Sequence, residues 1–198
     1  MGLKINYIEG QTPIDEDEKE GLLIKTISTR GELDEFEQAN IQQAIEWTIK
    51  TRFEKDEILT EDFILLVHKK MFGEVWEWAG TKRNTNKNIG VDKYLISSEI
   101  KKLTEDCRYW IDNKTYDSDE IAIRFSHRLV AIHVFPNGNG RHSRLIADIL
   151  ISNVFNKPVF TWGRANNSKR GDVRKRYLNS IYEGDKGSLQ SLIDFARS

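Results

Sequence analysis

The sequence predicts a mainly helical single domain with one small β-hairpin, and three observations support this prediction. Apolar residues recur at spacings of three and four along most of the chain, as they do on the buried face of a helix. The segment 81–93, TKRNTNKNIGVDK, is instead dense in Asn, Lys and Gly. Because these residues favour turns, we expect a short hairpin there, with a solvated surface loop as the alternative. No linker long enough to separate two domains interrupts the 198 residues.

The first helices are predicted from their caps and their periodicity. Residues 1–30 look extended, although the acidic run 15–20 marks a loop or the start of a helix. An amphipathic helix is expected over 32–50, with an apolar face made of Leu33, Phe36, Ile41, Ala44, Ile45 and Trp47. Thr60, which two acidic residues follow, is expected to cap the next helix, and Gly73 to end it.

Four more helices are expected in the second half of the chain. Ser97 or Ser98 caps one, and Asp117 or Ser118 caps the next. After a break at 136–140, a third runs to about Val154. The last pair covers 169–182 and, after a short gap, 189–197.

Composition excludes several classes of protein. The 31 acidic and 30 basic side chains give a net charge of −1, so we expect no direct nucleic-acid binding driven by phosphate neutralisation. The apolar run 145–151 is far shorter than the ~20 residues that span a bilayer. The first twenty residues hold no apolar run typical of a signal peptide. The lone Cys107 forms no intramolecular disulfide, and we expect a soluble protein of the reducing cytoplasm.

The segment 132–145, IHVFPNGNGRHSRL, is the one that predicts chemistry. Gly138 and Gly140 can adopt positive φ angles, so successive N–H groups can point the same way and form an anion nest. The nest leads into a helix N-terminus, which also favours anions. Arg141 and Arg144 share one face of that helix and suit a di- or triphosphate. His133 stands beside this cradle, where it could take a proton from a hydroxyl.

An ordinary helix–loop–helix turn with solvated arginines is the alternative. Two cations at a helix N-terminus oppose its dipole, however, and the loop contains no acid, so an anionic ligand is favoured. The P-loop, Rossmann and protein-kinase signatures are absent from the sequence. The three histidines near this segment lack metal-ligand spacing, which argues against zinc: His127, His133 and His142.

This segment resembles the Fic (Fido) signature H-x-F-x-[D/E]-G-N-G-R-x-x-R at every fixed position except 137. Residues 59–80, the Asn-rich segment, and Arg-Lys-Arg-Tyr at 174–177 are also similar to the family pattern, so the resemblance covers roughly 33–197. The stretch TRGELDEFEQANI further resembles the subgroup called mobile mystery protein B. The resemblance implies a helical Fic fold with a β-hairpin flap. It divides the chain into an N-terminal arm and helix at 1–58, a candidate inhibitory segment, and a catalytic core at 59–198.

The resemblance also implies an activity, protein adenylylation, in which AMP moves from ATP to a hydroxyl of a target protein. His133 would be the general base, and Phe135 would anchor the loop. The nucleotide would be held by Gly138, Asn139 and Gly140 around the phosphates, Arg141 at the β-phosphate, Arg144 at the γ-phosphate and Tyr177 at the adenine. The flap would bind an extended target segment by strand addition at Ile89, Gly90 and Val91. The sequence is compatible with either a monomer or an oligomer.

Position 137 departs from the family. Asn137 stands where an acidic residue usually binds Mg²⁺, and its amide oxygen can coordinate the ion but brings no charge. Two alternatives therefore stay open. One is a non-catalytic module that binds a nucleotide or a partner. The other is transfer of a different phosphate-containing group, such as phosphate or phosphocholine, by the same scaffold.

Many relatives are held inactive by a helix carrying [S/T]-x-x-x-E-[G/N]. Ser28 and Glu32 have the required spacing, although Leu33 follows where Gly or Asn is usual. Asn179 and Glu183 have the converse defect. We favour Glu32, which would pair with Arg144 and displace the γ-phosphate. The alternative is an ordinary first-turn acid, with inhibition supplied by an antitoxin-like partner.

Overall fold

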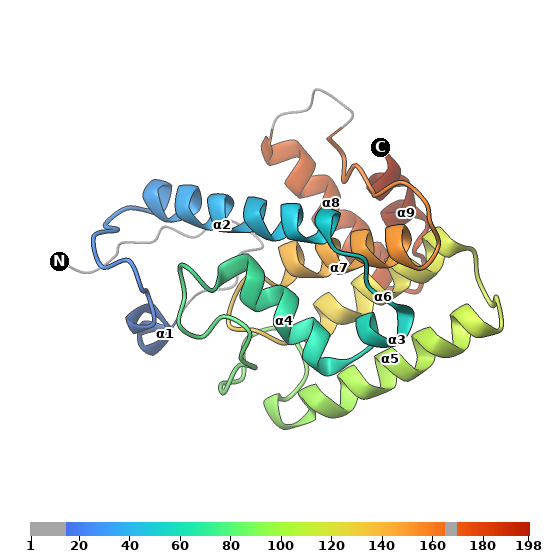
Figure 1. The fold of residues 1–198 in the computed structure, drawn as a ribbon, viewed down its shortest axis with the longest axis horizontal. Coiled ribbons are helices and arrows are strands. Elements are labelled where there is room, and N and C mark those ends of the chain that lie inside the picture. The colour runs from blue at the N-terminus through green and yellow to red at the C-terminus, as the bar shows by residue number, and fades with distance from the viewer. Residues whose placement is uncertain (1–14, 165–169) are drawn as a thin grey trace.

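The computed structural model describes residues 15–164 and 170–198, and the chain is mainly helical over these ranges (Figure 1). In chain order the elements are α1 (Glu16–Glu20), α2 (Arg30–Lys50), α3 (Lys55–Ile58), α4 (Glu61–Phe72), the 3₁₀ turn η1 (Lys93–Leu95), α5 (Ile96–Asp112), α6 (Ser118–Ile132), α7 (Asn139–Asn153), α8 (Arg170–Asp185) and α9 (Gln190–Arg197). The mainly helical fold predicted from the apolar periodicity is confirmed.

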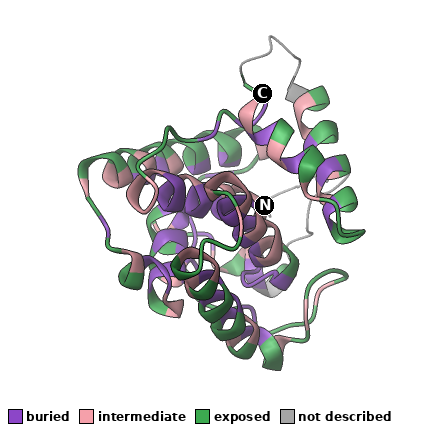
Figure 2. Ribbon diagram, turned by 90° about the vertical axis from the view of Figure 1, so that its right-hand side faces the viewer, coloured by how far each residue is buried: buried purple, intermediate pink, exposed green. Residues whose placement is uncertain are grey.

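Helices α6 and α7 form the centre of the fold. They pack against each other, α5 lies along α6, α2 packs on α4, and α8 pairs with α9 (Figure 1). Buried residues, in purple, gather on the helices in the middle of the molecule (Figure 2), and α6 and α7 contribute many of them. One apolar cluster joins α2 to α7, and a second, which includes Tyr177 and Phe195, fastens α8 and α9 to α6 and α7. The loop between α6 and α7 is therefore held from several sides.

Local capping explains where some of the helices begin. The Thr60 hydroxyl accepts a hydrogen bond from the Phe63 N–H at 3.1 Å, so the predicted cap of α4 is confirmed. Asp117 is the N-terminal residue before α6, as expected. Ser97 and Ser98 are not caps, because η1 precedes α5 and starts the helix at Ile96. The acidic run near residue 15 forms the short helix α1.

The predicted β-hairpin is wrong. Residues 81–92 form an irregular loop without strands, and the isolated β-bridge in the described ranges joins Leu22 to Trp76. One physical reason is Arg83, whose guanidinium lies inside the loop and donates to the carbonyls of Thr85 and Val91. A two-stranded ladder would need such carbonyls for its own N–H groups. We call residues 81–92 the flap loop.

The one cysteine of the chain lies inside the helical core. Cys107 is buried and unpaired, and burial raises the pKa of its thiol to about 12, so it behaves as a small apolar residue. Among the described residues, no helix is long and apolar enough to cross a membrane.

Candidate active site

The segment singled out by the sequence forms a tight connection between α6 and α7. α6 ends at Ile132, and His133 adopts the left-handed conformation with φ 57°. Gly138, at φ 81°, is the residue before α7. The Asn139 side chain clamps the loop, because it accepts from the Phe135 N–H at 2.9 Å and donates to the Phe135 carbonyl at 2.8 Å. The Gly138 N–H donates to the Asn137 amide oxygen at 2.7 Å, and the Arg141 N–H donates to the Gly138 carbonyl at 3.0 Å. The N–H groups between them, at Asn139 and Gly140, belong to the first turn of α7, which favours anions.

Helix α4 packs against this loop through His68 and Phe72. The His68 ring stacks on Phe135 with 3.6 Å between centroids, and its Nε2–H donates to the Asn137 carbonyl at 3.0 Å. Its Nδ1 accepts from the Gly80 N–H at 3.0 Å, which fixes the tautomer. Burial holds the pKa of His68 well below its usual range, so the ring is neutral. A Cβ at Gly138 would lie 2.6 Å from the Phe72 ring, so glycine is required there.

His133 is the first residue of the loop after α6, and it is 4 % exposed. Burial, followed by the charges of Arg83 and Lys87, lowers the pKa of its imidazole to about 4. The imidazole is therefore neutral near pH 7 and able to accept a proton from a hydroxyl that enters the site. This is the state that a general base needs before reaction.

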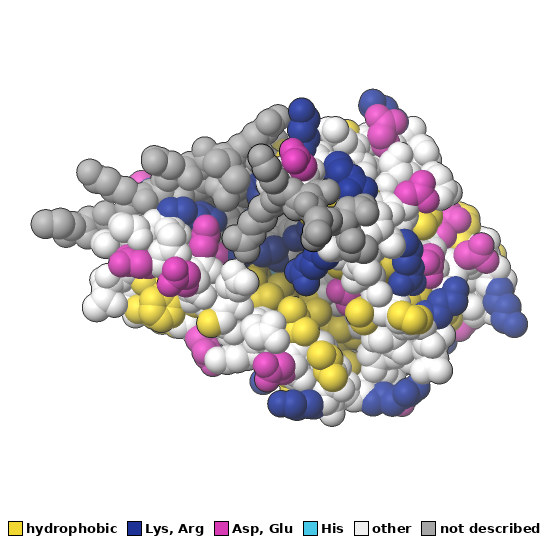
Figure 3. Space-filling model, turned by 90° about the horizontal axis from the view of Figure 1, so that it is seen from above, with side chains coloured by type: hydrophobic (Ala, Val, Ile, Leu, Met, Phe, Trp, Pro, Cys, Tyr) yellow, Lys and Arg dark blue, Asp and Glu magenta, His cyan; other side chains and the backbone are white. Residues whose placement is uncertain are grey.

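The structure places Arg144, the second arginine of the motif, beside Tyr177, which was predicted to line the adenine pocket. The Arg144 guanidinium lies over the Tyr177 ring, 4.7 Å from its centroid, and 6.0 Å from that of Trp162. A Cβ at Gly140 would be 3.7 Å from the Tyr177 hydroxyl, so the nest and Tyr177 are neighbours. Burial lowers the pKa of Arg144, but a guanidinium stays charged. Seen from above, Lys and Arg side chains gather in the middle of the face, beside apolar ones (Figure 3).

The first motif arginine is already paired with a carboxylate. Arg141 donates to Glu37 of α2 at 2.5 Å, and Glu37 is 2 % exposed. The other Glu37 oxygen accepts from the Trp76 indole N–H at 2.7 Å. Glu37 was not among the residues predicted from the sequence. Its signal was a charged residue four positions after Leu33, on the buried face of an amphipathic helix.

The predicted pair between Glu32 and Arg144 is not formed. One Glu32 oxygen accepts from the N–H groups of Ser28 and Thr29, at 2.8 and 3.0 Å, and from the Ser28 hydroxyl at 3.2 Å. These bonds lower the pKa of the exposed Glu32 carboxyl. Glu32 completes a capping box with Thr29 at the start of α2, so the first-turn acid given as the alternative is what the structure shows. Glu183 pairs with Lys186 instead.

Asn137 brings a neutral amide oxygen to the position predicted to bind magnesium. Its amide oxygen accepts from the Gly138 N–H at 2.7 Å and from Arg141 at 3.3 Å. Within the described ranges, no three His, Cys, Asp or Glu side chains group as metal ligands. Protein sites for Mg²⁺ ordinarily use one or two carboxylates, and this donor set has only a neutral oxygen beside a cation.

The flap loop lies directly on the predicted base. A Cβ at Gly90 would come within 2.5 Å of the His133 Cβ, and the Val91 N–H donates to the Ile132 carbonyl at 3.3 Å. Ile89 is half exposed beside them. The three residues predicted to dock a target therefore adjoin His133, although they do not form a strand.

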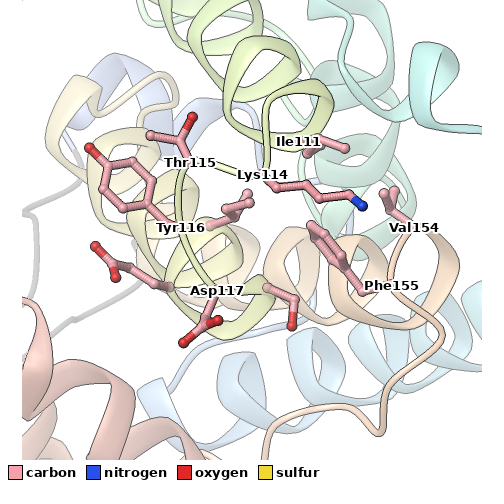
Figure 4. Close-up of a pocket in the computed structure, with 10 residues that line it drawn as sticks. Ile111, Lys114, Thr115, Tyr116, Asp117, Val154 and Phe155 are labelled. Atoms are coloured by element: carbon pink, nitrogen blue, oxygen red, sulfur yellow. The ribbon is translucent and has the colours of Figure 1, made fainter.

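A hollow of about 760 Å³ lies elsewhere, between the turn after α5 and the end of α7 (Figure 4). It is lined by Ile111, Lys114, Tyr116, Asp117 and Phe155 among others, and none of the predicted site residues reaches it. The candidate active site is therefore the α6–α7 connection and not this hollow.

Comparisons with known proteins place similarity over the segment that holds the candidate site. Residues 58–151 match the sequence model of the Fic/DOC family. The matched residues contain α4 to α6 and most of α7, including the whole motif loop. The placement in the mobile mystery protein B subgroup stays a prediction.

Two curated relatives are named protein adenylyltransferases. The Fic protein of Nematostella vectensis is 24 % identical over 82 % of this chain and 37 % of its own length. The fic-1 protein of Caenorhabditis elegans is 25 % identical over 72 % of this chain and 27 % of its own. This chain thus spans about a third of the curated relatives that it matches.

Solved Fic domains share the fold. The chain superposes on BepC of Bartonella tribocorum, solved with bound AMPPNP, with a TM-score of 0.69, 17 % identity and coverage of 92 % and 97 % of the two chains. It superposes on Fic-1 of C. elegans with a TM-score of 0.64, 21 % identity and coverage of 80 % and 46 %.

Proposed function

We propose that this protein is an adenylyltransferase that moves AMP from ATP to a hydroxyl group of a target protein. The observation that carries the proposal is the juxtaposition of a buried neutral imidazole, His133, with the N-terminus of α7 and its two arginines across a five-residue loop. The names of the relatives support the same class of reaction.

The chain's own groups account for the reaction as follows. The acceptor hydroxyl passes its proton to the His133 imidazole, and the hydroxyl oxygen attacks the α-phosphorus of ATP. The bond from the α-phosphorus to the bridging oxygen breaks, and pyrophosphate leaves with the electron pair. Negative charge on the phosphates is held by the α7 N-terminus, Arg141 and Arg144. Arg141 must first exchange Glu37 for a phosphate oxygen, because both compete for one guanidinium.

A second candidate is favoured by Asn137. Its oxygen faces Arg141 and brings no charge, as in a domain that binds a nucleotide without transferring any part of it. A third is transfer of another group, such as the terminal phosphate. The three candidates differ in which part of the nucleotide, if any, becomes attached to the target protein.

Labelled ATP separates the three candidates. The purified chain is incubated with protein extract and with ATP labelled at either the α- or the γ-phosphate, and nucleotide binding is measured in parallel by calorimetry. Acid-stable label from the α-position alone supports adenylylation. Label from the γ-position alone indicates phosphorylation and contradicts the proposal. Binding without label from either position leaves the non-catalytic module.

The target is proposed to dock as an extended segment beside residues 89–91, with an apolar side chain on the exposed Ile89. Glu37 supplies an acid within the chain, so inhibition does not require a separate antitoxin-like partner. The buried position of Glu37 supports a resting state in which the triphosphate site is partly closed.

A further inference from the structure

The flap loop and the predicted base are joined by one buried cation. Arg83 is 3 % exposed, and its guanidinium donates to three backbone carbonyls: to His133 from Nε at 2.6 Å, to Thr85 at 2.8 Å, and to Val91. In the described part of the chain, no carboxylate forms an ion pair with it. Burying a charge is costly unless hydrogen bonds replace its water, and here carbonyl oxygens do so.

The same contacts complete the end of α6. The last carbonyls of a helix have no partner within it. The Ile132 carbonyl accepts from the Val91 N–H at 3.3 Å, and the Val134 carbonyl accepts from the Arg83 N–H at 2.9 Å. The His133 carbonyl between them is taken by the Arg83 side chain. Three consecutive carbonyls around the base are thus satisfied by the flap loop.

This arrangement holds His133 in an uncommon conformation. A non-glycine residue with φ near 57° persists only where its surroundings define it, and Arg83 fixes the carbonyl of this one. Gly90 closes the contact, because a Cβ there would lie 2.5 Å from the His133 Cβ and 3.1 Å from the Arg83 guanidinium. Moving the loop therefore moves the base.

We propose that Arg83 is a positioning residue that locks the flap loop and His133 into one unit, so that an acceptor hydroxyl held along the loop meets the imidazole at a fixed distance. This inference rests on the proposed function. Arg83 acts through His133, and its side-chain hydrogen bonds within the described ranges go to the flap loop and the His133 carbonyl, not to the nest, Arg141 or Arg144. Its loss should therefore change transfer to a protein and leave nucleotide affinity unaltered.

The experiment compares Arg83→Gln and Arg83→Lys with Lys82→Gln, a control that removes a charge from the neighbouring position. Lys82 is exposed and contacts Glu61 and Ser97 instead of the base. Displacing a reacting group by about 1 Å costs about 10²-fold in rate. We expect Arg83→Gln to lower the rate constant of AMP transfer by about 10–100-fold with an unchanged Kd for a non-hydrolysable ATP analogue. Arg83→Lys should recover part of the rate, and Lys82→Gln should match the wild type.

A second readout is independent of activity. The imidazole of His133 is followed by NMR, in the free protein, through its chemical shifts and its titration. The two cations that act on it are Arg83 and Lys87, and removing Arg83 should raise the pKa of His133 from about 4 and shift its resonances. If the wild type transfers nothing but this change is seen, the proposed function fails while the positioning role stands.

Two results would overturn the inference. One is a folded Arg83→Gln protein whose His133 resonances and titration match the wild type. The other is equal loss of transfer and of nucleotide affinity. Should Arg83→Gln fail to fold, Gly90→Ala provides the second variant. Its added Cβ pushes the loop away from His133 and crowds the Arg83 guanidinium, but it removes no charge, and it should reproduce the loss of rate with an unchanged Kd.

Discussion

At the scale of single residues, the carboxylate on Arg141 is the most consequential contact that the sequence did not predict. Glu37 reaches the guanidinium that the Fic resemblance gives to the β-phosphate, and its second oxygen binds Trp76. Breaking a buried charge pair usually destabilises a protein because one charge is left alone. An incoming triphosphate would replace the lost charge, so Glu37 acts as a competitor of the nucleotide.

Glu37→Gln is therefore expected to tighten ATP binding. The amide keeps an oxygen for the Trp76 indole and preserves the helix, but it gives up the charge on Arg141. Typical couplings between sites are 1–3 kcal/mol, so we expect about 5–100-fold higher affinity, with more labelling from ATP. Titration calorimetry measures the change. Glu32→Gln is the control and should leave affinity unaltered, since Glu32 serves only the start of α2. If the two variants changed affinity alike, the role assigned to Glu37 would be wrong.

Asn137→Asp tests the metal position. A carboxylate at 137 supplies the hard, charged oxygen that Mg²⁺ prefers, whereas the amide supplies a neutral one. We expect tighter Mg²⁺ binding in the presence of nucleotide, and a higher transfer rate. Parallel magnesium titrations of the wild type and the variant measure this. Coincident curves would show that residue 137 contacts no metal.

At the scale of elements, α4 holds the motif loop that α6 and α7 connect. His68 fills the space against Phe135 and satisfies Gly80 and the Asn137 carbonyl at once. The N-terminus of α7 can present its N–H groups only if this loop is fixed. The anion site thus depends on a helix that contributes no residue to the signature.

His68→Ala should lower both stability and nucleotide affinity. The variant leaves a cavity and two unpaired buried polar groups, which together cost about 3–5 kcal/mol in the free energy of unfolding. Urea unfolding and calorimetry measure the two effects. His127→Ala is a matched control on α6. The His127 ring contacts Ile181 and Asp185 of α8 instead of the motif loop. This control should lose less stability and bind the nucleotide normally.

At the scale of the whole molecule, buried histidines set the acid limit of the fold. The pKa values of His133 and His142 fall to about 4 and about 3, and that of His68 lies well below its usual range, in each case mainly through burial. Below about pH 6.5 the unfolded chain binds protons that the native state refuses. Asp148 opposes this effect, because burial raises the pKa of its carboxyl to about 6.

Stability should therefore fall as pH drops from about 6.5 towards 4. Each histidine contributes about 1.4 kcal/mol per pH unit over this window, and Asp148 offsets about one of the three. Urea unfolding at pH 7.5, 6.0 and 5.0 should show a steady loss. His142→Gln should reduce the slope, because its side chain can still donate to the Ile64 carbonyl without titrating. A free energy of unfolding that is level across these pH values would contradict the assignment of neutral buried rings.

The sequence predicts what is local and misses what depends on packing. Thr60 and the Gly-Asn-Gly turn act within a few residues, so the cap of α4 and the α6–α7 connection follow from their composition. Glu37 and Arg83 act through partners 104 and 50 positions away, and no local pattern reveals them. The hairpin prediction was wrong, in part because the Arg83 side chain donates to backbone carbonyls that pairing between two strands would need. The predicted Glu32–Arg144 pair is not formed, because the spacing of Ser28 and Glu32 suits a capping box as well as an inhibitory motif.

The central claim is that His133 is the base in transfer of AMP, and one measurement tests it most directly. The wild type and His133→Ala are compared for label transferred from α-labelled ATP, with the Kd of a non-hydrolysable analogue measured on the same samples. We expect transfer to fall by about 10²–10⁴-fold while the Kd stays unchanged, because the imidazole acts on the acceptor hydroxyl and not on the phosphates. Undiminished transfer by His133→Ala would contradict the account.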